Sequence, residues 1–358
     1  MLAMLYSFCY NHGYSDLKGV ECMRIFLDAM GGDNAPQAPV DGALEALRLY
    51  PDLTIVLAGD LNVVEPLLRD CGELRSRIEL VDAPEVITND ESPVMGVRQK
   101  KKSATVIGML QLKEKQVDGF VSAGSTGAVL AGGMFRLGRI PGIERPALAP
   151  ILPNGQPVGA LLIDCGANVD CKPDYLVQFG MMGSVYMRDV MGVRDPRVGL
   201  INIGVETDKG NALVKETYPR MEKAPYNFVG NVEAREITNG AADVLVCDGF
   251  SGNLVLKFME GVAKTILGIV KKELLADTRS KLGAALAKPA FRRVKKDMDY
   301  SEVGGAPLLG VSGCVVKAHG SSNGHALCCA IKQLRKMIEA DVPGTIEKGL
   351  ADMLPDEE

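Results

Sequence analysis

Three short loops combine small residues with hydroxyl groups at places where a phosphate-sized anion could bind. Each stands between an apolar run and a helical pattern: Ser122-Ala-Gly-Ser-Thr-Gly-Ala128, Asp248-Gly-Phe-Ser-Gly-Asn253 and His319-Gly-Ser-Ser-Asn-Gly324. Backbone N–H groups at a helix start lack intrahelical acceptors and favour anions, and glycines let the anion approach closely. Glycine and serine also build ordinary turns, so each loop alone is a weak signal. Three in one chain indicate an anion site.

Several charged residues near such loops are candidates for the same site. Lys209 follows the apolar run Val198–Ile203 and could reach an anion, although a lone lysine in a turn is more often solvated. Asp248 could orient a base or could simply cap the next helix. The loop Asp28–Ala35 is a fourth anion-site candidate, but Asp28 and Asp33 would repel an anion unless they are paired.

Other kinds of active site lack their sequence signatures. No G-x-G-x-x-G follows a predicted strand and no G-x-x-x-x-G-K-[ST] is present, which argues against a dinucleotide site and a P-loop. Gly320–Gly324 fits G-x-S-x-G, but the only later histidine, His325, is too close to serve as a separately positioned base. The histidines and cysteines of residues 319–329 match no standard zinc spacing. We therefore expect no metal site.

Composition restricts the function classes further. The 358 residues carry 45 acidic and 40 basic side chains, a net charge of −5, which argues against a general nucleic-acid binder. Nine cysteines without a C-x-x-C pair are typical of reduced thiols in a cytosolic protein. No apolar run approaches the roughly 18–20 residues of a membrane span, and the N-terminus is a poor secretory signal. We expect a cytoplasmic protein that binds no nucleic acid.

From Met23 onward, short apolar runs alternate with helical patterns. This alternation predicts α/β architecture with a mostly parallel sheet covered on both faces. Asn154-Gly155, between the apolar runs Ala147–Leu152 and Val158–Cys165, predicts an antiparallel hairpin and hence a mixed sheet. The predicted strands are Arg24–Leu27, Leu53–Leu57, Ile78–Val81, Gly119–Ser122, Val198–Ile203, Asn227–Val229 and Val244–Cys247; the predicted helices include Asn62–Cys71, Ser103–Gln116, Thr126–Leu137, Asp174–Val190 and Ala212–Lys223.

Residues 253–297 break the alternation with two long helices. Apolar residues recur there at steps of four and three, at Val255, Met259, Val262, Ile266 and Ile269. Such a seam predicts either a helix on its own core or a protruding helical hairpin that pairs with its twin in a dimer. The basic, partly apolar end of the second helix could touch a membrane surface or an acidic partner, or could be a solvated face.

The N-terminal segment differs in pattern from the rest of the chain. Residues 1–22 are polar and turn-rich after Tyr10, which suggests an extension or a misplaced start codon. Residues 23–354 are expected to form one two-lobed catalytic unit that includes the hairpin 253–297.

Taken together, these segments resemble the phosphate acyltransferases of the PlsX family, the acyl-carrier-protein:phosphate transacylases of phospholipid synthesis. One position departs from the family pattern: Ser125 stands where the family usually has asparagine, and its shorter hydroxyl can still bond an anion. The matching segments run in order from Met23 to about Leu327 and are Leu27–Pro36, Ser122–Ala128, Glu144–Leu148, Asp164–Asp170, Leu176–Phe179, Asn202–Gly204 with Lys209-Gly210, Asp248–Asn253, Gly304–Gly310 and His319-Gly320.

The resemblance implies a fold like the isocitrate/isopropylmalate dehydrogenases and phosphotransacetylases, with two α/β/α lobes around a cleft. It also implies a homodimer in the bacterial cytoplasm with peripheral membrane association, the dimer and membrane contacts falling on the hairpin 253–297. The implied partners are acyl carrier protein, inorganic phosphate and a downstream glycerol-phosphate acyltransferase. No cofactor is implied beyond the phosphopantetheine that the carrier protein brings.

The implied reaction joins the acyl group of acyl-ACP to phosphate and releases the carrier protein. Phosphate is largely a dianion at neutral pH, with a second pKa of roughly 6–7, and a thiolate leaves without strong acid help. The protein must therefore position the reactants and stabilise an oxyanion, which needs neither a triad nor a metal.

On this hypothesis each candidate residue has a role. Two loops would cradle phosphate or the oxyanion through Gly124, Ser125, Thr126, Gly127, Ser251, Gly252 and Asn253. Lys209 would supply positive charge, while Asp248 and His319 would orient donors or move a proton. The acidic carrier protein would dock on Arg98, Lys101 and Lys102, or on Arg292–Lys296. The alternatives are a short-chain phosphotransacylase that uses acyl-CoA and a non-enzymatic scaffold at a lipid surface.

Overall fold

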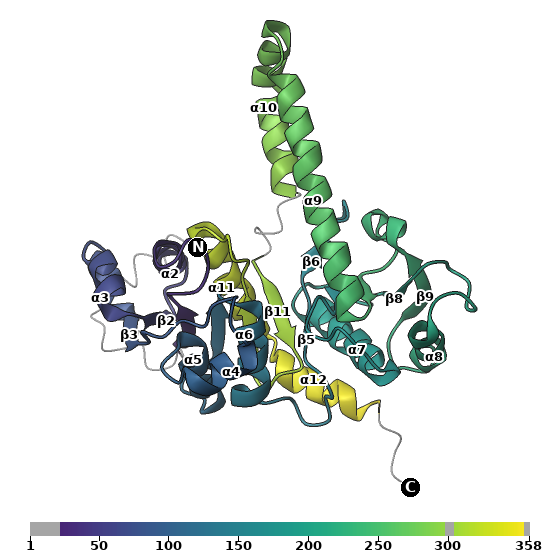
Figure 1. Cartoon of the computed structure of the whole chain (residues 1–358), viewed down its shortest axis with the longest axis horizontal. Coiled ribbons are helices and arrows are strands. Elements are labelled where there is room, and N and C mark those ends of the chain that lie inside the picture. The colour runs from purple at the N-terminus through teal and green to yellow at the C-terminus, as the bar shows by residue number, and fades with distance from the viewer. Residues whose placement is uncertain (1–21, 298–303, 354–358) are drawn as a thin grey trace, which may run out of the picture.

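The chain folds into two lobes, each built on its own sheet (Figure 1). The computed structural model describes residues 22–297 and 304–353, so the predicted N-terminal extension lies outside the described residues except for Cys22. The first sheet has the strand order β3-β2-β1-β4-β12-β11-β5 and the second has the order β6-β7-β10-β8-β9. The two-lobed α/β architecture expected from the sequence is confirmed.

Both sheets are mixed but mainly parallel, because β11 runs antiparallel to its neighbours and β6 runs antiparallel to β7. The strands of the first sheet are β1 (Met23–Asp28), β2 (Leu53–Gly59), β3 (Ile78–Asp82), β4 (Gly119–Ser122), β5 (Ala147–Leu148), β11 (Ala306–Leu309) and β12 (Cys314–Lys317). Those of the second are β6 (Ile151–Leu152), β7 (Ala160–Ile163), β8 (Val198–Asn202), β9 (Phe228–Glu233) and β10 (Val244–Val246).

The predicted hairpin is confirmed, but only in part of its first strand. Ile151 pairs with Leu161 and Leu152 with Ala160, around the Asn-Gly turn. The preceding residues of the same apolar run form β5, which pairs with β11 in the other sheet. The single run read from the sequence therefore crosses from one lobe to the other.

Helices cover both faces of each sheet. On one side of the first sheet, α2 (Gln37–Leu49) and α11 (Gly324–Glu339) pack together. On the other side, α5 (Ala104–Lys113) packs on β1, β2 and β4. Near α5 lie α4 (Pro93–Gln99), α6 (Thr126–Gly132) and the π-helical turn η3 (Gly133–Leu137). On one face of the second sheet α7 (Pro173–Asp189) packs on β7, β8 and β10, with α8 (Ala212–Met221) beside it on β8 and β9. The base of α9 (Gly249–Leu274) packs on the other face. The chain ends with α12 (Val342–Ala351) on α7.

The predicted helix Asn62–Cys71 is broken into short pieces. It forms α3 (Leu61–Val64) followed by the 3₁₀ turn η1 (Glu65–Leu68). Elsewhere in the chain, 3₁₀ turns are formed by η2 (Gly72–Arg77) and η4 (Ala234–Asn239). Pro66 lies in the middle of this segment, and its missing N–H and ring geometry do not allow a continuous α-helix.

Buried strands are apolar on both faces because helices lie above and below them. In β7, Leu161 and Ile163 belong to the core that includes α7, whereas Ala160 and Leu162 belong to a smaller core on the opposite face. All four side chains are inaccessible to solvent.

The helical hairpin is formed by α9 (Gly249–Leu274) and α10 (Thr278–Asp297), which project together from the second lobe (Figure 1). Val255 and Met259 pack against the smaller core, so the expected seam lies on the chain's own core at its base. Further out, Val262, Ile266 and Ile269 are 39%, 51% and 57% exposed. No helix in residues 22–297 or 304–353 has the length and apolar character needed to cross a membrane.

One buried hydrogen-bond chain joins the two lobes. Gln333 of α11 donates through Nε2 to the Tyr186 hydroxyl of α7 at 2.8 Å, and its Oε1 accepts from the Gly305 amide at 2.8 Å. Tyr186 is fully buried and Gln333 nearly so. This chain therefore holds the lobes in one register.

Replacing Tyr186 with phenylalanine tests that chain. The change removes the acceptor of a buried amide N–H, so we expect the free energy of unfolding to fall by about 1–3 kcal/mol in denaturant titrations. The control is Tyr218→Phe, a half-buried tyrosine whose hydroxyl makes no hydrogen bond recorded among the described residues, with a change within about 0.5 kcal/mol. Equal effects of the two substitutions would contradict the role of the chain.

Candidate active site

Three neighbouring strands end in polar residues at one edge of the first sheet. Asp28, Ser122 and Lys317 are the last residues of β1, β4 and β12, which lie side by side and parallel. The loops that follow these strands line a cavity of about 630 Å³. The carboxyl edge of a parallel sheet is where ligands bind in open α/β folds.

Asp28 and Ser122 form a buried network beneath the cavity. The Ser122 hydroxyl donates to Asp28 Oδ2 at 2.7 Å and accepts from the Gly124 amide at 2.9 Å, while the Met30 amide donates to Asp28 Oδ1 at 3.0 Å. Burial raises the pKa of Asp28, and these hydrogen bonds and the charge of Lys317 act in the opposite direction. The network fixes the backbone of two cavity loops.

Lys317 is a buried cation at the cavity, and the sequence analysis missed it. Its side chain is largely enclosed, and Nζ donates to the carbonyl oxygens of Ala123, at 3.3 Å, and Ala318. Burial lowers the pKa of Lys317 to about 8, while Asp28 and Asp33 favour its charged form. Two features of the sequence pointed to Lys317: it stands at the end of an apolar run before a glycine-containing loop, and Asp28 and Asp33 needed a cationic partner.

Two glycines allow the loops to converge. A Cβ on Gly31 would lie 2.6 Å from the Gly124 amide nitrogen, and one on Gly32 would lie 2.9 Å from the carbonyl oxygen of Gly320. Gly32 also has φ of +99°, a conformation that side chains disfavour. The loop Asp28–Ala35 is thus part of the site and not a separate anion loop.

The predicted loop 122–128 reaches the cavity with three of its four candidates. Gly124, Ser125 and Thr126 line it, and the Ser125 hydroxyl caps α6 by accepting from the Ala128 amide at 3.4 Å. Gly127 is not among the lining residues: a Cβ there would lie 2.5 Å from Pro93, so this glycine lets α4 and α6 approach.

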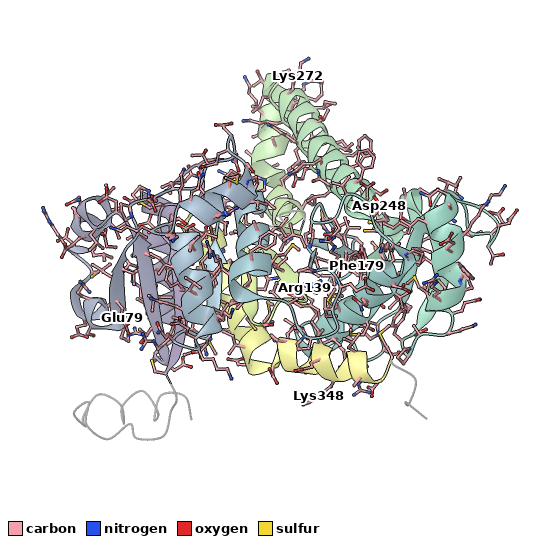
Figure 2. All side chains as sticks on the ribbon, turned by 60° about the horizontal axis from the view of Figure 1, so that its bottom comes forward. Glu79, Arg139, Phe179, Asp248, Lys272 and Lys348 are labelled. Atoms are coloured by element: carbon pink, nitrogen blue, oxygen red, sulfur yellow. The ribbon has the colours of Figure 1, made fainter. Side chains whose placement is uncertain are left out.

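The predicted loop 248–253 contributes one residue to the cavity, Asn253. Asp248, at the base of the hairpin (Figure 2), caps α9 by accepting from the Ser251 amide at 2.8 Å and its hydroxyl at 3.0 Å. Neither Asp248 nor Ser251 lines the cavity. The polar groups of Asp248 and Ser251 therefore cap α9 and do not line the cavity.

Gly252 packs against the backbone of Asp164. A Cβ on Gly252 would lie 1.9 Å from the Asp164 carbonyl oxygen. The Asp164 carboxylate is fully buried and accepts from the Leu148, Ala167 and Asn168 amides at 2.9, 3.2 and 2.6 Å. Burial raises the pKa of Asp164 to about 6, against these hydrogen bonds. Gly252 thus has a packing role and lies outside the cavity lining.

His319 lines the cavity beside Gly320. Its Nδ1 accepts from the Ser321 amide at 3.2 Å and lies 2.8 Å from the Ser321 hydroxyl. Burial lowers the pKa of His319 below its usual value, so the ring is neutral at neutral pH. Because Nδ1 accepts, the neutral ring carries its hydrogen on Nε2.

Lys209 lies outside the cavity. It is exposed on the loop between β8 and α8, where its amide donates to the Glu206 carbonyl at 3.3 Å. The structure does not bring it together with the loops at β1, β4 and β12.

The basic cluster lies next to one cavity wall. Arg98, Lys101 and Lys102 are exposed at the end of α4. Lys100 between them donates to the Val86 carbonyl and to Glu91, both at 2.6 Å, and residues 86–90 line the cavity. The exposed cations therefore lie near the cavity wall formed by residues 86–90, to which Lys100 ties the cluster.

The remaining walls are partly apolar. Leu148, Ile151 and Leu256 line the cavity, as does an ion pair within α9 between Lys257 and Glu260, at 2.9 Å. Cys165 also lines it, but burial raises the pKa of its thiol to about 12, so it is no nucleophile at neutral pH.

Two competing kinds of site gain no support. Ser322, the serine of G-x-S-x-G, is buried, whereas a nucleophile elbow exposes its serine. Within the described ranges no three His, Cys, Asp or Glu side chains gather as metal ligands would.

Two solved structures with a similar fold are phosphotransacetylases. One from Streptococcus pyogenes aligns with a TM-score of 0.56 at 15% identity, over 88% of this chain and 94% of that chain. A EutD phosphotransacetylase from Staphylococcus aureus aligns with a TM-score of 0.57 at 16% identity, over 90% and 95%. At these identities the likeness shows the shared two-lobed fold alone.

Sequence relatives identify the family. The family model described as "Fatty acid synthesis protein" matches residues 23–345. Relatives named phosphate acyltransferase include those of Alkaliphilus oremlandii, 48% identical over 94% of this chain and 99% of its own length, and Oceanobacillus iheyensis, 49% identical over 90% and 96%. The chain belongs to the phosphate acyltransferase (PlsX) family of acyltransferases. It therefore acts on an acyl donor and phosphate in lipid biosynthesis.

Gly252→Ala tests whether the start of α9 is held by packing. The added Cβ would collide with the Asp164 carbonyl, so we expect the free energy of unfolding to fall by about 1–3 kcal/mol. Gly261→Ala is a matched control in the same helix, where nothing lies within 4 Å, and should stabilise by up to about 1 kcal/mol. Denaturant titrations that show the same sign for both substitutions would overturn the packing role.

Proposed function

We propose that the chain transfers a fatty acyl group from the thioester of acyl carrier protein to inorganic phosphate and so supplies acyl phosphate for phospholipid synthesis. The observation that carries this proposal is the single cavity in which three glycine-rich strand-end loops meet an apolar wall. The loops suit a phosphate and an oxyanion, and the apolar wall suits the first part of an acyl chain.

The reaction needs no covalent intermediate on the protein. A phosphate oxygen attacks the thioester carbon, the carbonyl electrons move onto oxygen, and a tetrahedral oxyanion forms. As the C=O bond is restored, the C–S bond breaks and the phosphopantetheine thiolate leaves to take a proton from solvent. Positioning and oxyanion stabilisation are the protein's contribution, and no cofactor of its own is required.

The cavity supports a narrower set of roles than the sequence suggested. Gly124, Ser125 and Thr126 line the cavity at the start of α6, where helix amides without intrahelical acceptors favour an anion, although the Gly124 amide itself donates to Ser122. Asn253 offers a side-chain amide donor from the opposite wall. His319 can donate through Nε2 to phosphate or to the oxyanion.

The other predicted residues act at a distance from the cavity. Asp248, Ser251 and Gly252 set the start of α9, and Gly127 sets the start of α6. The positive charge proposed for Lys209 has no support from its exposed position away from the cavity.

The carrier protein is acidic, so its docking requires basic side chains near the cavity opening. The exposed trio Arg98, Lys101 and Lys102 meets that requirement through its link to residues 86–90. The uncovered apolar side chains of α9 support the further proposals that the hairpin contacts a second copy of the chain and the membrane surface. Such a protein would act in the cytoplasm beside the membrane.

A short-chain transacylase that uses acyl-CoA is the second candidate, favoured by the fold shared with phosphotransacetylases. A comparison of acyl donors distinguishes the two functions, because the proposed function requires long-chain acyl-ACP to give a much higher kcat/KM than acetyl-CoA. A lipid-surface scaffold would form no acyl phosphate with either donor.

Asn253→Ala tests the cavity in this reaction. With palmitoyl-ACP and phosphate, hydroxylamine should trap palmitoyl phosphate as the hydroxamate only when phosphate is present. We expect Asn253→Ala to lower kcat/KM by about 100-fold, the usual effect of removing one oxyanion donor. Asn239→Ala, in the exposed turn η4, is the control and should retain wild-type activity. Full activity of Asn253→Ala would remove it from the site.

Charge reversal tests the docking surface. Replacing Arg98, Lys101 and Lys102 with glutamate should raise the KM for palmitoyl-ACP by at least about tenfold at low salt, while the KM for palmitoyl-pantetheine stays unchanged. The control Lys336→Glu changes an exposed lysine in the last turn of α11, at the far end from the cavity. An unchanged KM for palmitoyl-ACP in the triple variant would rule out this surface.

A further inference from the structure

Lys317 is an enclosed ammonium group at a cavity that must bind an anion. It ends β12, the central neighbour of β4 and β11, and its side chain is only 7% exposed. Lysine is rarely buried to this degree, because removing its charge from water is unfavourable. A structural ion pair would explain the burial only if the lysine were sealed in the core, yet Lys317 lines the cavity.

The hydrogen bonds of Lys317 leave one donor for a ligand. An ammonium group has three hydrogens. Two of them point to the carbonyl oxygens of Ala123 and Ala318, which are the described acceptors within hydrogen-bond distance. Both carbonyls belong to residues that line the cavity, so the nitrogen lies at the level of the loops that meet there.

The surrounding acidic groups keep Lys317 charged but do not fill the cavity. Asp28 is engaged by Ser122 and by the Met30 amide below the loops. Asp33 contributes its negative charge from the following loop. Two backbone carbonyls fix the ammonium in place before any anion arrives, and the charges of Asp28 and Asp33 favour its protonated form. Such preorganisation is what an anion site requires.

We propose that Lys317 is the catalytic residue whose ammonium group binds the phosphate dianion and stays on it as the tetrahedral oxyanion forms, and that Asp28 is the positioning residue whose negative charge favours this ammonium. This inference rests on the proposed function. It assigns to Lys317 the positive charge that the sequence analysis gave to Lys209.

The proposal predicts a pH dependence with a definite sign. Lys317 loses its positive charge as pH rises through about 8, so phosphate binding weakens above that pH. The groups that face Lys317 are Asp28, Asp33 and Lys257, and His319 senses its charge in turn. The pKa of His319 lies below its usual value, and the second pKa of phosphate is roughly 6–7. The titration of neither group therefore changes phosphate binding near pH 8.

The experiment measures the KM for phosphate and for palmitoyl-ACP separately, from pH 6.5 to 9.5. In the wild-type protein the phosphate KM should rise about tenfold per pH unit above pH 8, with the KM for palmitoyl-ACP changing less than twofold. Lys317→Met should raise the phosphate KM by at least 100-fold at pH 7. If Lys317 had only a structural role, its replacement would not raise the KM for phosphate selectively over the KM for palmitoyl-ACP.

Two further variants keep the test informative if Lys317→Met folds poorly. Lys317→Arg retains a charge that does not titrate, so it should bind phosphate at pH 7 and lose the rise above pH 8. Asp28→Asn removes the carboxylate that favours the ammonium, so the rise should move to lower pH. Circular dichroism and thermal melts establish that each variant is folded.

The outcomes separate this inference from the proposed function. If the wild-type protein makes no palmitoyl phosphate, the proposed function is wrong. If it does, but the phosphate KM stays flat through pH 9 or a folded Lys317→Met keeps the wild-type phosphate KM, the role of Lys317 is wrong while the proposed function stands.

Discussion

The site depends on the burial of opposite charges at the ends of parallel strands that flank a common neighbour. Asp28 and Lys317 are nearly 300 residues apart in the chain, yet β1 and β12 both border β4, so their last residues lie on either side of Ser122. A carboxylate and an ammonium out of water are tolerated only when each finds partners. Ser122, the Met30 amide and two carbonyls provide them, and this requirement fixes the loops above the sheet.

The second lobe completes the cavity mainly through the start of α9, together with Ile151 and Cys165. Asn253, Leu256 and Lys257 come from the start of α9, whose position is set by the fit of Gly252 against Asp164. The first lobe supplies the loops at β1, β4 and β12. The Gln333–Tyr186 bond and the bond from the Leu148 amide to Asp164 therefore both link the two halves of the cavity.

The fold was more predictable than the site. Strand positions such as Gly119–Ser122 follow from local apolar runs, because burial on both sheet faces leaves a signal within a few residues. The strand-to-helix loop before α6, which lines the cavity, was predictable for the same local reason. Gly252 and Asp248 carry the same local signals but serve packing and capping, which depend on Asp164 in a distant segment. Lys317 had only a weak local signal, its place at the end of an apolar run before a glycine loop, since its burial depends on strands that the sequence does not place side by side.

Cys165 has a consequence for the fidelity of acyl transfer. A thiolate beside a thioester would undergo transthioesterification and hold the acyl group as a dead-end adduct. With its pKa raised to about 12 by burial, this thiol is protonated at pH 7, and its hydrogen points to the Gly252 carbonyl, 3.6 Å from the sulfur. In the proposed reaction, burial of Cys165 would thus prevent self-acylation and leave phosphate as the acceptor.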